Sequence, residues 1–93
     1  MEFLVHVEID LPTSWAEGEA SALRAAELAR AAELRASGKL VRIWRIPGRQ
    51  ANWSLYSVAD ASELDAVISS LPLWPWMTVE VHALAVHPVE ADS

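Results

Sequence analysis

Glu27 is the acidic side chain of this 93-residue sequence whose surroundings best suit proton transfer. If residues 23–34 are helical, each residue advances by about 100°, so Leu23, Glu27 and Leu34 share one stripe. The leucines should face a core, so the carboxylate between them would be desolvated. Desolvation raises a carboxyl pKa and suits the group to taking and returning a proton. An i,i+3 ion pair between Glu27 and Arg30 is the alternative, and spacing alone favours it.

A second set of polar side chains surrounds a predicted turn at residues 47–48. It consists of Arg45, Arg49, Gln50 and Asn52. Guanidinium and amide groups in such a turn can hold a carboxylate or a carbonyl oxygen. A solvated hairpin end is the alternative, and residue types alone favour it.

Two further patterns have a chemical and a structural interpretation. His6 and Glu8 share a strand face, and Glu80 and His82 share another, so a metal site would need the two strands to be neighbours. Such a face is more often a polar surface or a subunit contact, and we expect no metal.

The aromatic residues Trp74 and Trp76 are separated by Pro75. They can wall a small pocket, and of the two we expect Trp76 to contact a substrate. Packing in a core or an interface is the more frequent role of each residue alone.

The elements that must position these side chains follow the order β-α-β-β-α-β. Alternating apolar residues predict strands at both ends of the chain, and turn residues delimit two more in its middle. A segment rich in Ala, Leu, Glu and Arg predicts a helix of about 20 residues, and a second helix is shorter. The predicted strands are residues 3–11, 40–46, 50–58 and 77–85, and the helices lie within residues 14–37 and 60–71.

Both helices have the Ser/Asp-x-x-Glu pattern of a capping box at their predicted start. Ser14 with Glu17 would cap the first helix, and Asp60 with Glu63 the second. Gly38 is a natural end for the first helix. The residues from His87 onwards are predicted to form a polar tail.

This order is typical of an α+β, ferredoxin-like fold, in which two helices cover one face of a four-stranded antiparallel sheet. The length predicts one domain over residues 1–93. The core should lie under the helices. The open face carries apolar residues such as Leu4 and Leu84 among its charges, so we expect it to pair with a second copy.

Composition narrows the classes of partner and compartment. Seven Lys and Arg against thirteen Asp and Glu give a formal net charge of −6, which disfavours nucleic acid and membrane surfaces as partners. The absence of cysteine excludes disulfides and thiol chemistry. No signal peptide or membrane span is apparent, so we expect a cytoplasmic protein.

Several segments, taken together, resemble the muconolactone isomerase family. They are Leu11-Pro12, Glu27 within the long helix, Gly38, the stretch IWRIPGRQANWSLYSV, and SLPLWPWMTVEV followed by His87-Pro88. The resemblance extends over nearly the whole chain without evident insertions. It implies a ferredoxin-like unit that pairs by its sheets into a dimeric α+β barrel, with further assembly into homo-oligomers that are typically decamers.

The resemblance also implies an activity, the cofactor-independent conversion of muconolactone to 3-oxoadipate enol-lactone during aromatic degradation. Glu27 matches the family's catalytic glutamate, and Asn52 matches its asparagine near the lactone. Arg45 and Arg49 are candidate partners of the substrate carboxylate.

Gln50 is a departure, because the family usually has a tyrosine there. A glutamine donates only a neutral amide hydrogen bond. Two alternatives therefore stand beside the isomerase: a small-ligand-binding or assembly protein, and a related lactone enzyme such as a chloromuconolactone dehalogenase. On strand three, alternation leaves open whether Asn52 or Trp53 faces the helices.

Overall fold

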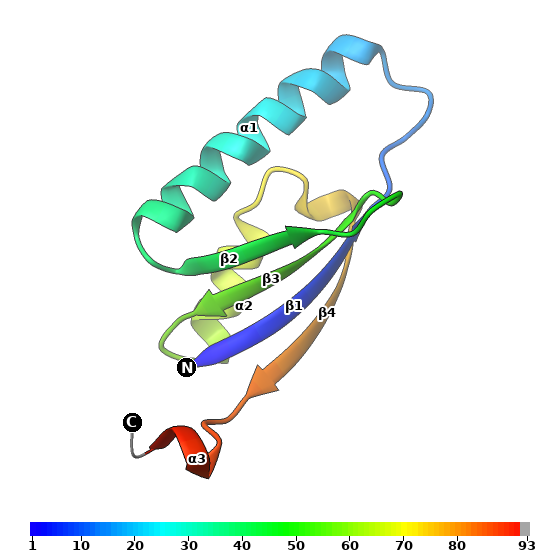
Figure 1. The fold of residues 1–93 in the computed structure, drawn as a ribbon. Helices are drawn as coiled ribbons and strands as arrows, with labels where there is room; N and C mark the ends of the chain where they lie inside the picture. The colour runs from blue at the N-terminus through cyan, green and yellow to red at the C-terminus, as the bar shows by residue number, and fades with distance from the viewer. Residues whose placement is uncertain (92–93) are drawn as a thin grey trace.

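The computed structural model describes residues 1–91 and has the α+β architecture and element order expected from the sequence (Figure 1). The strands are β1 (Glu2–Ile9), β2 (Leu40–Arg45), β3 (Ala51–Ser57) and β4 (Met77–Leu84). The main helices are α1 (Glu17–Ala36) and α2 (Ala61–Ser69). The described residues also contain two short helical segments, the 3-10 turn η1 (Trp74–Trp76) and α3 (Pro88–Ala91).

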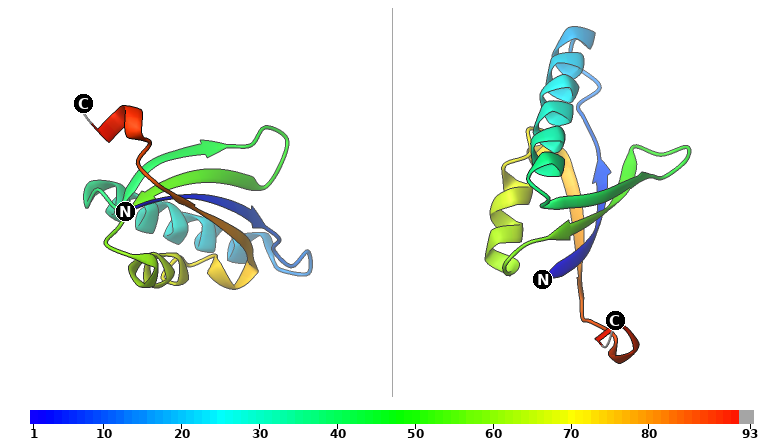
Figure 2. Two further views of the ribbon diagram at one scale, coloured as in Figure 1. Left: turned by 90° about the horizontal axis from the view of Figure 1, so that it is seen from below. Right: turned by 60° about the vertical axis from the view of Figure 1, so that its left-hand side comes forward.

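The four strands form one antiparallel sheet in the order β2-β3-β1-β4. Both α1 and α2 lie on the same side of this sheet, as Figure 2 shows from two directions, and neither of them covers the other side. The arrangement is the predicted ferredoxin-like one. Among the described residues, no helix combines the length and apolar composition that crossing a bilayer requires.

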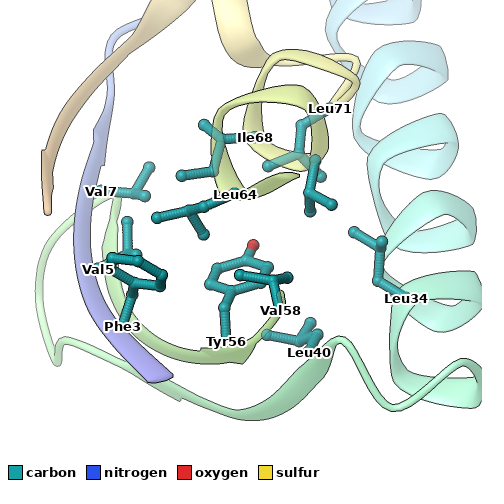
Figure 3. Close-up of a cluster of buried hydrophobic side chains, with 11 residues drawn as sticks. Phe3, Val5, Val7, Leu34, Leu40, Tyr56, Val58, Leu64, Ile68 and Leu71 are labelled. Carbon is teal, nitrogen blue, oxygen red and sulfur yellow. The ribbon is translucent and has the colours of Figure 1, made fainter. Parts of the chain in front are cut away.

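The core lies between the sheet and the helices, as expected from the alternation in β1. Phe3, Val5 and Val7 all point to this side and are almost completely buried. Leu34 of α1 and Leu64 of α2 close over them (Figure 3). Burying each such side chain contributes roughly 1.5–3 kcal/mol, so these contacts fix how the two helices sit on the sheet.

The predicted capping box at Ser14 is wrong. Helix α1 begins at Glu17 after Ala16, whose side chain makes no capping hydrogen bond. The preceding segment is held elsewhere, because Asp10 donates its N–H to the Trp76 carbonyl at 2.9 Å. Trp15 packs edge-on against Trp76 with ring centroids 4.6 Å apart. These tertiary contacts keep Ser14 outside the first turn.

Other boundaries match the predictions more closely. The Asp60 carboxylate accepts the Glu63 N–H at 2.8 Å, which confirms the predicted start of α2. Strand β1 ends at Ile9, two residues earlier than predicted. The expected polar tail contains one helical turn, α3, which begins at Pro88. Proline is well tolerated at the first position of a helix because its missing N–H needs no partner there.

Candidate active site

A cavity of about 490 Å³ lies beneath α1, beside the β2–β3 hairpin and the segment that leads from α2 to β4. Its polar lining residues are Arg24, Glu27, Arg45, Arg49, Gln50 and Asn52. Its apolar lining residues are Ile9, Leu28, Ala31, Ile43, Ala51 and Leu73. The structure therefore brings together five of the six site residues predicted from the sequence, and they come from elements far apart in the chain.

Glu27 lies in the middle of α1 and is half-buried against the cavity. The backbone N–H of Leu73 donates a hydrogen bond to Glu27 Oε1 at 3.0 Å. Burial raises the pKa of the Glu27 carboxyl above its usual 4.5, and the bond from Leu73 offsets part of that rise. A carboxyl group with a raised pKa that faces a cavity is suited to receive a proton and give it back.

The alternative ion pair between Glu27 and Arg30 is absent from the described structure. Arg30 instead donates to Glu33 Oε2 at 3.1 Å and to Ser70 Oγ at 3.1 Å. Its guanidinium is thus directed toward the end of α2. The hydrogen-bond donor to Glu27 is the neutral backbone N–H of Leu73. Arg30 therefore does not lower the pKa of Glu27.

A bulge in β2 sets the direction in which Arg45 points. Leu40 and Arg42 pair with consecutive residues of β3, so Val41 is an extra residue in the ladder. Beyond the bulge Arg45 lies opposite Asn52. Without the bulge, strict alternation from the buried Leu40 would turn Arg45 to the open face.

The orientation of β3 answers the question that the sequence left open. Asn52 lies opposite Val7 in the ladder and therefore faces the helices. Trp53 faces the open side, where its ring is 4.8 Å from His6 and 5.9 Å from His82. Asn52 and Glu27 of the same chain consequently line one cavity.

The three arginines at the cavity have different partners. Arg24 donates to Gln50 Oε1 at 3.0 Å. Arg49 forms an ion pair with Glu8, on the side of the hairpin where a second hollow of about 380 Å³ lies. Among the described residues, Arg45 has no ion pair or hydrogen bond from its side chain. Within the part of the chain that the structure describes, Arg24 and Arg45 are thus the cations of the cavity that no carboxylate neutralises.

Two predicted features do not belong to this cavity. Trp76 packs against Trp15, and the structure does not place it in the cavity wall. On the open face, His82 Nε2 contacts Glu80 Oε1 at 3.1 Å and His6 lies against Trp53. Within residues 1–91 no three potential metal ligands converge.

Several residues at the site were not predicted from the sequence. Arg24 lies three positions before Glu27 and so shares its helix face, which is a signal that spacing offers. Leu73 contributes a backbone group, and Ser54 bonds to Asn52 Oδ1 at 2.8 Å from inside the core. These two contacts depend on the tertiary fold and have no local signature in the sequence.

The chain is similar to known proteins over nearly its whole length. The muconolactone delta-isomerase family profile matches residues 1–90. The muconolactone delta-isomerase of Acinetobacter baylyi is 39% identical over 88 residues, which cover 95% of this chain and 92% of that protein. The crystal structure of a muconolactone isomerase superposes with a TM-score of 0.91 at 34% identity, covering 100% of this chain and 97% of the other.

A more distant structure shares only the fold. It is the 5-chloro-2-hydroxyhydroquinone dehydrochlorinase of Burkholderia phenoliruptrix, with a TM-score of 0.71 and 17% identity over 97% of this chain and 99% of that one. The Acinetobacter baylyi enzyme and the muconolactone isomerase structure match this chain at much higher sequence identity and over nearly the full length of both proteins. This chain belongs to the muconolactone delta-isomerase family.

Proposed function

We propose that this protein isomerises muconolactone to 3-oxoadipate enol-lactone without a cofactor, with Glu27 as the base that moves the proton. The observation that carries the proposal is the half-buried Glu27 carboxyl with its raised pKa, which faces a cavity lined by the Asn52 amide and by cations. The names of the relatives support the choice of substrate, and this geometry supports the role proposed for Glu27.

The reaction moves one proton and one double bond. The Glu27 carboxylate takes the proton from the ring carbon that bears the ring oxygen, so a C–H bond breaks and an O–H bond forms. The released electron pair shifts the double bond and places negative charge on the lactone carbonyl oxygen. Glu27 then returns the proton to the carbon next to that carbonyl. Nothing is oxidised or reduced, so the step needs no co-reactant.

The dienolate oxygen needs hydrogen-bond donors while it carries charge. The side-chain amides of Asn52 and Gln50 both line the cavity and each offers N–H donors. Removing one such donor in characterised enzymes costs about 10²–10³-fold in rate. Arg24 holds Gln50 Oε1 at 3.0 Å, so the amide nitrogen of Gln50 is left to donate elsewhere.

The carboxylate of the substrate needs a cation. Arg24 and Arg45 line the cavity and have no carboxylate partner among the described residues, whereas Arg49 is paired with Glu8. A guanidinium can bind a carboxylate with two parallel hydrogen bonds. We therefore assign the substrate carboxylate to Arg24 and Arg45 and give Arg49 a structural role at the hairpin.

We further propose that the protein is a cytoplasmic homo-oligomer that pairs through the open face of its sheet, as in a dimeric α+β barrel. Apolar side chains on that face include Leu4, Trp53 and Leu55, and Trp44 and Leu84 remain 43% and 41% exposed in the isolated chain. Their burial in a pair of sheets would remove this apolar surface from water. Light scattering after size-exclusion chromatography measures whether the species is a dimer, a decamer or a monomer.

Glu27→Gln tests the proposed function directly. The variant keeps the shape of the side chain and removes the base, so turnover of muconolactone should fall by at least about 10³-fold. Glu33→Gln, at an exposed position of the same helix, is the control and should retain wild-type turnover. Product formation is followed by proton NMR in D₂O.

The outcomes separate the candidate functions. Unchanged turnover in Glu27→Gln would remove Glu27 from its proposed role. If the wild-type protein turns over no lactone, including chlorinated muconolactones, but its melting temperature rises with them, a ligand-binding module is favoured. Turnover of a chlorinated lactone alone would favour the dehalogenase.

A further inference from the structure

The helix-covered face of β3 is polar where a core is expected. Asn52, Ser54 and Tyr56 alternate along the strand and all point toward the helices. Ser54 is 2% exposed and is the one buried polar residue apart from Tyr56 in the part of the chain that the structure describes. Burial of an unpartnered hydroxyl is costly, so this position needs an explanation by its hydrogen bonds.

The Ser54 hydroxyl is bonded to Asn52. Ser54 Oγ donates to Asn52 Oδ1 at 2.8 Å. A serine has one hydroxyl proton, and in Ser54 that proton is directed at Asn52. Among the described residues, no buried side-chain polar atom lacks a partner.

Tyr56 lies two residues after Ser54 on the same face of the strand. Its side chain is 4% exposed and its hydroxyl points into the interior between the helices (Figure 3). Burial raises the pKa of Tyr56 to about 12, the negative charge of Glu27 adds to the rise, and a side-chain hydrogen bond with Ser54 opposes it. Ser54 thus lies between Asn52 and a buried aromatic side chain on this face of β3.

This direction determines which end of the Asn52 amide meets a ligand. With Oδ1 held by Ser54, the amide nitrogen and its two protons are left for the cavity that Asn52 lines. A flipped amide would present an oxygen to the dienolate oxygen, and the two would repel. Stabilisation of that charge therefore depends on the amide being held in one orientation before the substrate arrives.

We infer that Ser54 is a positioning residue, which locks the Asn52 amide with its N–H₂ group toward the substrate oxygen. The inference rests on the proposed function for its kinetic consequence, although the Ser54–Asn52 hydrogen bond itself does not. Ser54 does not need to touch the substrate. Its effect on the rate acts through Asn52.

Ser54→Ala is the central test, with Ser57→Ala on the exposed end of the same strand as the control. In Ser54→Ala, kcat for muconolactone should fall about tenfold with KM nearly unchanged, equivalent to about 1.4 kcal/mol in the transition state. Ser54→Thr retains a hydroxyl and should recover most of the loss.

A double-mutant cycle separates positioning from damage to the core. If Ser54 acts through Asn52, Ser54→Ala should have no further effect on kcat in an Asn52→Ala background. A purely structural role would lower activity equally in both backgrounds, and that result would overturn the inference.

A second measurement does not depend on turnover. In ¹⁵N-labelled protein the side-chain amide resonances of Asn52 should shift in Ser54→Ala and remain unchanged in Ser57→Ala. Unshifted Asn52 resonances would refute the Ser54–Asn52 hydrogen bond itself. Absence of lactone turnover in the wild-type protein would instead refute the proposed function, so the two failures are distinguishable.

Discussion

Glu27→Asp tests whether the position of the carboxylate matters as well as its charge. The change removes one methylene and withdraws the carboxylate by about 1.5 Å, the length of one carbon–carbon bond. The Leu73 N–H now lies 3.0 Å from Glu27 Oε1. With the shorter side chain, the distance from the Leu73 nitrogen to the carboxylate oxygen becomes roughly 4 Å, beyond the range of about 2.7–3.2 Å in which N–H···O hydrogen bonds form.

Two magnitudes follow from that displacement. Misplacing a catalytic group by about 1 Å can cost about 10²-fold in rate, so kcat should fall about 100-fold while some turnover remains. A hydrogen bond to a charged group contributes about 1.5–3 kcal/mol. Its loss leaves a buried Leu73 N–H without a partner, so we expect the variant to lose about 1.5 kcal/mol of stability at neutral pH.

Steady-state kinetics on muconolactone and urea unfolding at a fixed protein concentration measure the two effects. Glu33→Asp, exposed on the same helix, is the control for the lower helix propensity of aspartate. Wild-type kcat in Glu27→Asp would refute the geometric argument. Stability equal to that of Glu33→Asp would refute the role assigned to the Leu73 N–H.

Three other changes have expected outcomes. Because burial raises the pKa of Glu27 above 4.5, the folded state binds that proton more tightly than the unfolded chain, so wild-type stability declines as pH rises through the raised pKa. Glu27→Gln lacks this decline, and its melting temperature should exceed that of the wild type at neutral pH but not below pH 4.5. Gly48→Ala should cost about 1–2 kcal/mol in urea unfolding, because Gly48 has φ of 77°. Asp60→Ala removes the cap on the Glu63 N–H and should cost about 1 kcal/mol in the same assay.

Features that arise from one element were predictable. Alternation in β1 assigned Phe3, Val5 and Val7 to the core, where all three are buried. Helical spacing placed Glu27 on the stripe that includes Leu34, and the structure has Glu27 half-buried and Leu34 almost inaccessible. Both predictions needed only the periods of strand and helix.

Features that arise between elements were not predictable. No residue type in β2 predicts a bulge at Val41, yet that bulge turns Arg45 toward the cavity. Arg30 donates to Glu33 and to Ser70, a residue 40 positions away, and not to Glu27 as helical spacing favoured. Ser14 fits the local rule for a cap, but contacts between Trp15 and Trp76 shift the start of the helix.

Strand β3 shows why the site itself resisted prediction. Trp53 and Leu55 are its most apolar residues, and burial in the core is what their composition favours. The structure turns them to the open face and places Asn52, Ser54 and Tyr56 under the helices.

This inverted orientation of β3 is stable because Ser54 hydrogen-bonds to Asn52, which lines the cavity. No buried polar side-chain atom among the described residues lacks a hydrogen-bond partner. The inverted orientation also gives the open face an apolar surface that a second copy of the chain would cover. At a functional site, a strand can bury polar residues and expose apolar ones, because residues needed for the reaction can lower the stability of the fold. In β3 one inversion accounts for both the polar floor of the proposed active site and the surface through which we propose that subunits pair.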